Sequence, residues 1–504
     1  MKKGPGKAEY WNEEHQVKWR CASMRAGKSK LAILLLACVL AAGCADKGNR
    51  NQNEHTGLTG TNGQNSESGN QVNVPGNGDS EAGQTDPSGA GGDSVNNGEG
   101  NADSNTGSGS GGGSSGNPGP GSEVGNEPGE SGEPPAEDAV SEKVRQQLAA
   151  MTLDEKLGEM IIAGIAGNTA GEQTKRMIAQ QHVGGIIFYK ENVTDPKGVV
   201  KYVNQLNGWN KDNDAPLFIS VDEEGGRVSR LPGLERLPTG REVGKANSTS
   251  YAAEIGGFLG DASSSMGFNM DFAPVLDINS NPKNPVIGDR SFGATSKLVT
   301  DMGMNVMKGI ASAGVIPVVK HFPGHGDTSV DSHLELPVVK KSLTQLKAFE
   351  WVPFKEAIQE GADVVMIAHI LFPKLDPSYP ASLSKVVITD ELRGTLGFKG
   401  VVITDDLTMG AIAKNYGMGE AAVRTIKAGS DILLVAHGYD NVDKILAALK
   451  SSVKKGDITQ KRIDESVTRI LQLKEKYQLT DDTTIQTPNL TNLNAAIRKA
   501  TAAH

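Results

Sequence analysis

The chain has 504 residues and a formal net charge of −9, from 51 Lys and Arg residues against 60 Asp and Glu residues. Because no basic stripe is visible in this acidic sequence, a nucleic-acid partner is not expected. The three cysteines, Cys21, Cys38 and Cys44, all lie near the N-terminus, so the sequence excludes a disulfide framework in the rest of the chain.

Residues 1–43 are predicted to be a signal peptide of the lipoprotein type. An apolar run at 31–40 follows Lys28 and Lys30, and it is shorter than the roughly 20 residues that a membrane-spanning helix requires. Small residues at 41–43 lead directly into Cys44, which is typical of a bacterial lipobox. We therefore expect lipidation of Cys44 and an extracytoplasmic protein that is anchored to the cell membrane. The alternative is an ordinary signal peptide that happens to be followed by a cysteine.

Residues 44–139 are predicted to form a disordered tether. They are mainly Gly, Ser, Asn, Asp, Glu and Pro, so they cannot bury enough apolar surface to offset the entropy of the chain. A Gly/Ser-rich coil of about 95 residues has an r.m.s. reach of roughly 50–60 Å. Such a tether would let an anchored domain work within a wall-like matrix.

From residue 140 onward, short apolar stretches rich in Val and Ile alternate with helix-like stretches. Strands are expected at 158–166, 183–189, 216–221, 270–276, 315–319, 363–370, 400–404 and 431–436. Helices are expected at 297–313, 343–360, 419–428 and 460–477. Eight strands in about 290 residues predict an α/β fold, a single-domain (β/α)8 TIM barrel at 140–480, because such barrels typically take about 250 residues. Residues 481–504 are expected to be a C-terminal tail.

An open doubly wound sheet is the alternative fold. It would carry a Gly-rich turn for a dinucleotide or phosphate after an early strand, and no such turn occurs. The barrel is therefore favoured, and no cofactor is expected.

Polar side chains follow the predicted strands at the points where the strands end. The carboxyl ends of parallel barrel strands meet at one face, so we expect these side chains to share a cavity. The polar residues at these ends are Asp222, Arg227, Arg230, Asp277, Asn279, Arg290, Lys320, His321, His369, Asp405, Asp406 and His437. Acids, bases and cations around one cavity are suited to a polyhydroxylated substrate.

The densest of these motifs is KHFPGHGDTSVDSH at 320–333. A metal-dependent barrel hydrolase, with His321, His325, Asp327 and His333 as ligands, is one interpretation. Metal-binding barrels usually take their ligands from several strands, whereas these residues crowd one loop. A sugar-binding lipoprotein is another alternative, and the pattern of eight strands disfavours it.

Five motifs identify the family. They are KHFPGHGDTSVDSH at 320–333, VDEEGGRVSR at 221–230, GDRSF at 288–292, VVITDDLTMGAI at 401–412 and MTLDEKLGEM at 151–160. Together they resemble the β-N-acetylglucosaminidases of glycoside hydrolase family 3, and the resemblance extends over 140–479. It implies a retaining exo-enzyme that removes terminal GlcNAc from cell-wall muropeptides or chitin-type oligosaccharides. A β-glucosidase-like activity is the alternative within the family.

The resemblance also implies roles for individual residues. Asp405 would be the nucleophile; strand alternation alone does not separate it from Asp406, but the family pattern points to the first aspartate. His333 would be the acid/base, with Asp331 accepting a hydrogen bond from its ring. Other branches of the family take their acid from a glutamate in a second domain, and residues 480–504 leave no room for one, so the acid is expected from the barrel.

The sugar is expected to bind five further residues by the same resemblance. They are Asp222, Arg230, Arg290, Lys320 and His321. A carboxylate accepts hydrogen bonds from vicinal hydroxyls, while Lys and Arg donate to their oxygens. Arg227, Asp289 or Glu223 could form salt bridges that position these ligands, and His325 and Asp327 are expected to shape the loop. We expect a monomer that acts on a carbohydrate.

Overall fold

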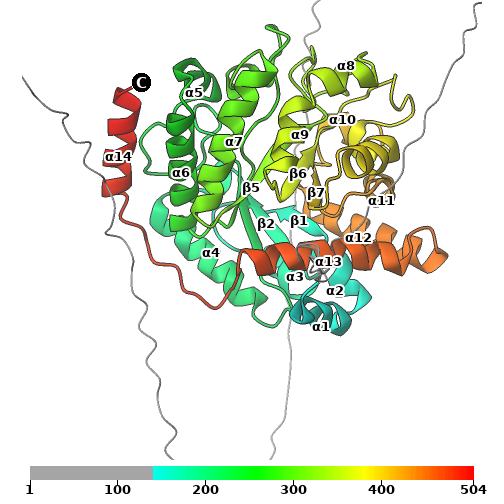
Figure 1. The fold of residues 1–504 in the computed structure, drawn as a ribbon. Coiled ribbons are helices and arrows are strands. Elements are labelled where there is room, and N and C mark those ends of the chain that lie inside the picture. The colour runs from blue at the N-terminus through cyan, green and yellow to red at the C-terminus, as the bar shows by residue number, and fades with distance from the viewer. Residues whose placement is uncertain (1–139) are drawn as a thin grey trace, which may run out of the picture. The chain divides into compact units, whose positions relative to one another are not determined.

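Parallel strands form the centre of the structure, a computed structural model that describes residues 140–504 (Figure 1). Eight strands occur in this part of the chain: β1 (Ile161–Gly164), β2 (Gly185–Phe188), β3 (Phe218–Val221), β4 (Met270–Asp271), β5 (Ile316–Phe322), β6 (Val364–Ile367), β7 (Val401–Thr404) and β8 (Leu433–Val435). They pair in the order β7-β6-β5-β4-β3-β2-β1-β8. A parallel bridge between Ile403 and Ile432 joins β7 to the chain entering β8. The predicted (β/α)8 barrel is thereby confirmed.

The strands are apolar because both of their faces are covered. Their residues are buried almost without exception, as expected for parallel strands between a barrel interior and a layer of helices. Each predicted strand is present, with shorter bounds in most cases. β4 is interrupted after Asp271, where the backbone N–H of Ala273 donates to the carbonyl of Asp271, and a parallel bridge between Val275 and Lys320 continues the pairing with β5. β5 instead continues beyond its predicted end, through Lys320 and His321 to Phe322.

Helices surround the barrel (Figure 1). The α-helices are α1 (Glu142–Ala150), α2 (Leu153–Glu159), α3 (Glu172–Ala179), α4 (Pro196–Asn210), α5 (Gly240–Ala246), α6 (Thr249–Ser265), α7 (Ser296–Ser312), α8 (Leu343–Ala348), α9 (Val352–Gln359), α10 (Gly410–Ala413), α11 (Met418–Ala428), α12 (Tyr439–Lys455), α13 (Gln460–Lys476) and α14 (Thr491–Ala502). The other helical segments are the 3-10 helices η1 (Lys190–Asn192), η2 (Gly288–Arg290) and η3 (Ala381–Leu383) and the π-helix η4 (Val386–Thr395).

The single helix predicted at 343–360 is wrong, because the chain breaks it into α8 and α9. Pro353 lies in the first turn of α9, where its missing N–H costs nothing. In a continuous helix its ring would clash with the carbonyl of Phe349. The break also turns Trp351 into the core, where it is fully buried.

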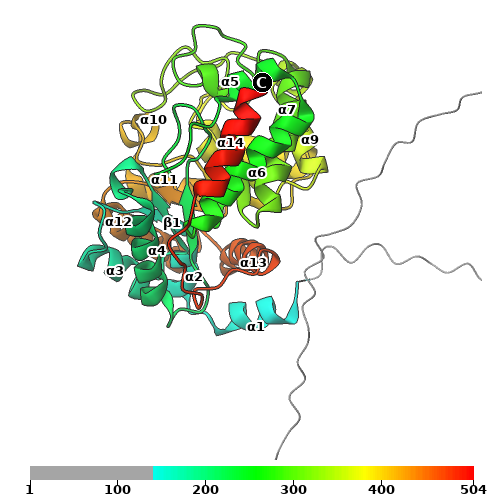
Figure 2. The same ribbon diagram turned by 90° about the vertical axis from the view of Figure 1, so that its left-hand side faces the viewer.

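Residues 481–504, for which the sequence predicted no regular element, contain α14. This helix lies along α6 on the outside of the barrel (Figure 2). Ile497 and Ala500 are buried against residues of α5 and α6, so the helix is docked by apolar contact.

The predicted signal peptide at 1–43, Cys44 and the tether at 44–139 lie outside the described residues. Among the helices of residues 140–504, none is long and apolar enough to span a membrane.

Candidate active site

A cavity of about 300 Å³ opens at the carboxyl ends of the strands. Every catalytic and sugar-binding residue predicted from the sequence lines it, namely Asp222, Arg230, Arg290, Lys320, His321, Asp331, His333 and Asp405. Lys320 and His321 lie in β5, and the others come from segments that follow β3, β4, β5 and β7, which only the barrel brings together. Of the twelve strand-end residues expected to share one cavity, Asp277, Asn279 and His369 do not line it, so the expectation holds for the other nine. The cavity lies at the functional face of (β/α)8 barrels.

An ion-pair network covers one wall of this cavity. The Lys320 ammonium lies 2.6 Å from Asp222 Oδ1 and 2.7 Å from Glu224 Oε1. Arg290 donates two hydrogen bonds, of 2.8 and 2.7 Å, to the two oxygens of Glu224. Burial alone would raise the pKa of Glu224, but Arg290 and Lys320 outweigh it and hold the pKa well below its ordinary value. Glu224 is therefore charged, and the ion pairs orient the four side chains relative to one another.

The sequence suggested Glu223 for such a salt bridge, and the structure shows that this prediction is wrong. The carboxylate of Glu223 instead accepts hydrogen bonds from the backbone N–H groups of Arg230, at 2.7 Å, and Leu231, at 3.0 Å. The next residue, Glu224, takes part in the ion-pair network described above. The suggested pair of Arg227 and Asp289 is confirmed, with 2.7 Å between Nε and Oδ1.

Lys320 and His321 both line the cavity although they are consecutive in β5. In a regular strand, successive side chains point to opposite faces. The pairing of β5 with β6 is irregular between Val319 and Phe322, which lets both side chains reach the cavity. His321 Nδ1 lies 2.6 Å from Oδ2 of the buried Asp277, which fixes the orientation of the ring.

Asp331 and His333 form a dyad at the mouth of the cavity. The ring N–H at Nδ1 of His333 donates to Asp331 Oδ1 at 2.8 Å, and the backbone N–H of His333 donates to the same oxygen at 2.9 Å. Partial burial would raise the pKa of Asp331, but the hydrogen bonds from His333 hold it below its ordinary value. The His333 side chain is 62% exposed, so its free Nε2 is open to a ligand in the cavity.

The other titratable residues of this loop hold it in shape, as predicted. His325 is buried, with its two ring nitrogens 3.0 Å from the hydroxyls of Thr328 and Ser332. Burial lowers the pKa of His325 to about 4, so the ring is neutral. Asp327 pairs with Lys341 at 3.1 Å. Within residues 140–504, no group of three or more His, Cys, Asp or Glu side chains is arranged to hold a metal ion.

Asp405 follows β7 and is half-buried in the wall of the cavity. Burial would raise its pKa, but His369, His321 and the backbone N–H of Asp406 lower it to about 2. The N–H of Asp406 donates to Asp405 Oδ1 at 2.9 Å. Asp405 is therefore an anion at neutral pH.

Asp406 has a different environment. Its Oδ1 accepts hydrogen bonds of 2.9 Å from the backbone N–H groups of Thr408 and Ala436, and its Oδ2 accepts from the Thr408 hydroxyl. These contacts tie the loop after β7 to the end of β8. Three donors thus occupy the carboxylate of Asp406, whereas Asp405 has one.

The loop of the Asp331–His333 dyad is joined to the loop that follows Asp405. The backbone N–H of Gly410 donates to the carbonyl of His333, and that of Ala411 donates to the carbonyl of Ser332, both at 3.1 Å. A Cβ at Gly410 would lie 2.6 Å from the carbonyl oxygens of His333 and Leu334. Only glycine fits this contact without moving the dyad.

Two aromatic rings also line the cavity: Tyr189, which no motif singled out, and His437, one of the predicted strand-end residues. Tyr189, at the end of β2, packs on His437, after β8, with ring centroids 5.3 Å apart. Burial and the nearby charges of Asp222, Asp406 and Asp405 raise the pKa of Tyr189 well above its ordinary value, so its hydroxyl stays protonated. The position of Tyr189 at the end of β2 is the sequence feature that could have identified it as a cavity residue.

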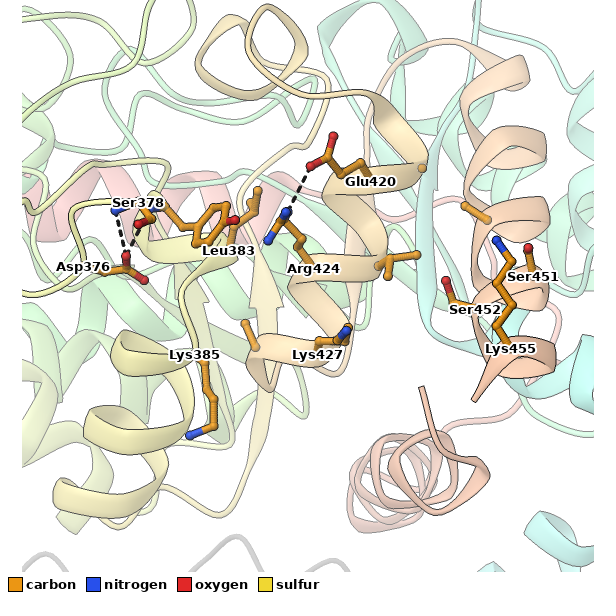
Figure 3. Close-up of a pocket in the computed structure, with 15 residues that line it drawn as sticks. Asp376, Ser378, Leu383, Lys385, Glu420, Arg424, Lys427, Ser451, Ser452 and Lys455 are labelled. Atoms are coloured by element: carbon orange, nitrogen blue, oxygen red, sulfur yellow. Dashed lines mark hydrogen bonds and ion pairs between the residues drawn. The ribbon is translucent and has the colours of Figure 1, made fainter. Parts of the chain in front are cut away.

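A larger hollow, of about 720 Å³, lies on the outer side of the barrel between α11, α12 and residues 376–385 (Figure 3). Its Arg424 pairs with Glu420 at 3.0 Å and lies over the ring of Tyr379. It contains no histidine–carboxylate dyad, and none of the predicted site residues lines it. The smaller cavity is therefore the candidate active site.

Comparison with known proteins identifies relatives of the chain. The model of the family described as "Glycosyl hydrolase family 3 N terminal domain" matches residues 152–473. Beta-hexosaminidase A of Pseudoalteromonas piscicida is 33% identical over 337 residues, which are 62% of this chain and 56% of that protein. The beta-hexosaminidase of Nitrosomonas eutropha is 33% identical over 330 residues, which are 63% of this chain and 93% of that protein.

Solved structures agree as well. The family 3 β-N-acetylglucosaminidase of Paenibacillus sp. str. FPU-7 matches with a TM-score of 0.66 and 42% sequence identity. The match covers 70% of this chain and 68% of that one.

Proposed function

Since the chain belongs to glycoside hydrolase family 3, we propose that this glycoside hydrolase removes terminal β-linked N-acetylglucosamine by a retaining mechanism. The observation that carries the proposal is the single cavity that joins Asp405, the Asp331–His333 dyad and the sugar-binding residues. The names of the β-hexosaminidase relatives support the choice of sugar.

In the first step, the Asp405 carboxylate attacks the anomeric carbon and the glycosidic bond breaks. The leaving oxygen takes the proton from Nε2 of His333, so the aglycone departs as an alcohol. Asp331 accepts a hydrogen bond from Nδ1, which fixes the tautomer of the ring and stabilises its protonated form. The product of this step is a glycosyl ester of Asp405.

In the second step, neutral His333 removes a proton from water, and the water oxygen attacks the anomeric carbon. The ester bond breaks, Asp405 regains its charge, and the sugar leaves with retained β-configuration. A carboxylate whose pKa is about 2 is a good leaving group at neutral pH, which favours this step.

The sugar ring would be held by the ion-pair wall of the cavity. Asp222 can accept hydrogen bonds from two neighbouring hydroxyls, and Lys320 can donate to one of their oxygens. Arg290, His321 and Arg230 would complete the set. Because the ion pairs already orient these side chains, little side-chain entropy is lost when the sugar binds.

We place the enzyme outside the cytoplasm, anchored to the membrane through Cys44, where it would act on muropeptides or chitin-type fragments. The predicted lipobox and the composition of residues 44–139 support this location.

An assay with two chromogenic substrates tests the proposal. The purified protein should cleave an aryl β-N-acetylglucosaminide with a higher kcat/KM than the matching aryl β-glucoside. EDTA should leave the rate unchanged, because no step uses a metal. A preference for the glucoside would contradict the choice of sugar, and a loss with EDTA that Zn²⁺ restores would contradict the mechanism.

Gly410→Ala should lower kcat/KM by roughly 10²-fold, because displacing a proton donor by about 1 Å has an effect of this order. The added Cβ would meet two backbone carbonyls of the dyad loop, which cannot rotate away. Gly417→Ala is the matched control, since a Cβ there meets nothing within 4 Å. Steady-state kinetics and thermal melting of both variants check this, and equal activity of the two would disprove the role of the contact.

A further inference from the structure

Helix α14 reaches the loop that carries Arg230. The side-chain amide of Asn494 donates to the carbonyl of Gly233 at 2.8 Å, and its oxygen accepts from the backbone N–H of Glu235 at 2.9 Å. Arg498, one turn further on, pairs with the Glu235 carboxylate at 2.5 Å. The C-terminal helix therefore holds residues 233–235, three to five positions after a sugar-binding residue.

Arg230 depends on its backbone for its position. Its Nε is buried and has no hydrogen-bond partner among residues 140–504. The backbone is fixed at Arg230 and Leu231 by Glu223, as described above. The next hydrogen bonds to the backbone of the loop are those of Asn494. Two clamps, one from the barrel and one from α14, thus determine where the guanidinium points.

The helix is firmly attached to the barrel. Its Ile497 and Ala500 are buried, and the ring of His504, just beyond it, lies 4.1 Å from that of Tyr251 in α6. Figure 2 shows α14 in front of α6, running up toward α5. The family match ends at residue 473, so this clamp lies outside the region common to the family.

We propose that α14 is part of the substrate-binding apparatus, and that Asn494 is a positioning residue that orients Arg230 through Gly233 and Glu235. The amide side chain is suited to this task, because it offers one donor and one acceptor to a carbonyl and an N–H two residues apart. The proposal rests on the proposed function for the role of Arg230 in sugar binding.

The test is a double-mutant cycle on an aryl β-N-acetylglucosaminide. Asn494→Ala should raise KM by about 3- to 10-fold with kcat nearly unchanged, as expected for the loss of two hydrogen bonds that support binding. Asn492→Ala, on the exposed side of the same helix, is the control and should match the wild type. In an Arg230→Ala background, Asn494→Ala should have no further effect on KM.

An equal rise in KM with and without Arg230 would overturn the proposal, because Asn494 would then act on the fold in general. An unchanged KM in Asn494→Ala would overturn it as well. Hydrogen exchange gives a readout that needs no activity: the amide of Glu235 should exchange faster in Asn494→Ala than in Asn492→Ala. If the wild type does not cleave the substrate, the proposed function fails, while equal exchange in the two variants rejects the clamp itself.

Discussion

Asp405→Asn is expected to reduce turnover of an aryl β-N-acetylglucosaminide by roughly 10⁴- to 10⁶-fold, because it removes the nucleophile of a covalent mechanism. The fold should survive, since an amide oxygen can still accept the hydrogen bond from the N–H of Asp406. Steady-state kinetics and a thermal melt of the same sample measure the two effects. A 2-fluoro glycoside inhibitor should also label Asp405 in the wild type.

Asp406→Asn is the matched comparison. An amide oxygen can still accept from the backbone N–H groups of Thr408 and Ala436, but the N–H₂ group would then face the Thr408 hydroxyl, which must turn from donor to acceptor. We expect a loss of stability of about 1 kcal/mol, because a charge-assisted hydrogen bond becomes a neutral one, and a turnover far above that of Asp405→Asn. Peptide mapping that finds the label on Asp406 would reverse the assignment of the nucleophile.

His333→Ala should lose about 10²- to 10⁴-fold in rate on a disaccharide, which is the range of general acid–base catalysis. A sugar is a poor leaving group and needs the proton from His333. An activated aryl leaving group needs little protonation, so formation of the glycosyl-enzyme should be far less affected. Azide attacks that intermediate without general-base help, so it should restore part of the aryl rate.

Asp331→Asn should show a milder form of this pattern, because it disturbs the ring tautomer but leaves the base in place. The comparison requires kcat/KM on the disaccharide and on the aryl substrate, with and without azide. An equal loss on both substrates and no rescue by azide would mean that His333 supports the loop or the sugar, and that the acid lies elsewhere.

The order of the elements follows directly from the sequence. Each strand is an apolar run bounded by polar or turn residues, so all eight were found, and polar residues at or just after the ends of β3, β5, β7 and β8 line one cavity. The sequence pattern did not predict the break between α8 and α9 or the presence of α14. Pro353 breaks a helix within an otherwise continuous apolar pattern, and α14 docks through only a few buried side chains, such as Ile497 and Ala500.

The sequence by itself therefore determined the barrel and the strand ends that surround its cavity, because hydrophobic periodicity and strand ends are local properties of the chain. The tertiary structure decided which of two adjacent acidic residues takes which role. Glu224 rather than Glu223 joins Lys320 of β5, and Asp406 rather than Asp405 accepts from the N–H of Ala436 after β8, because partners from other strands select between adjacent side chains. The contacts of Gly410 with the dyad loop and of Asn494 with the Arg230 loop join segments far apart in the sequence, so only the folded chain reveals them.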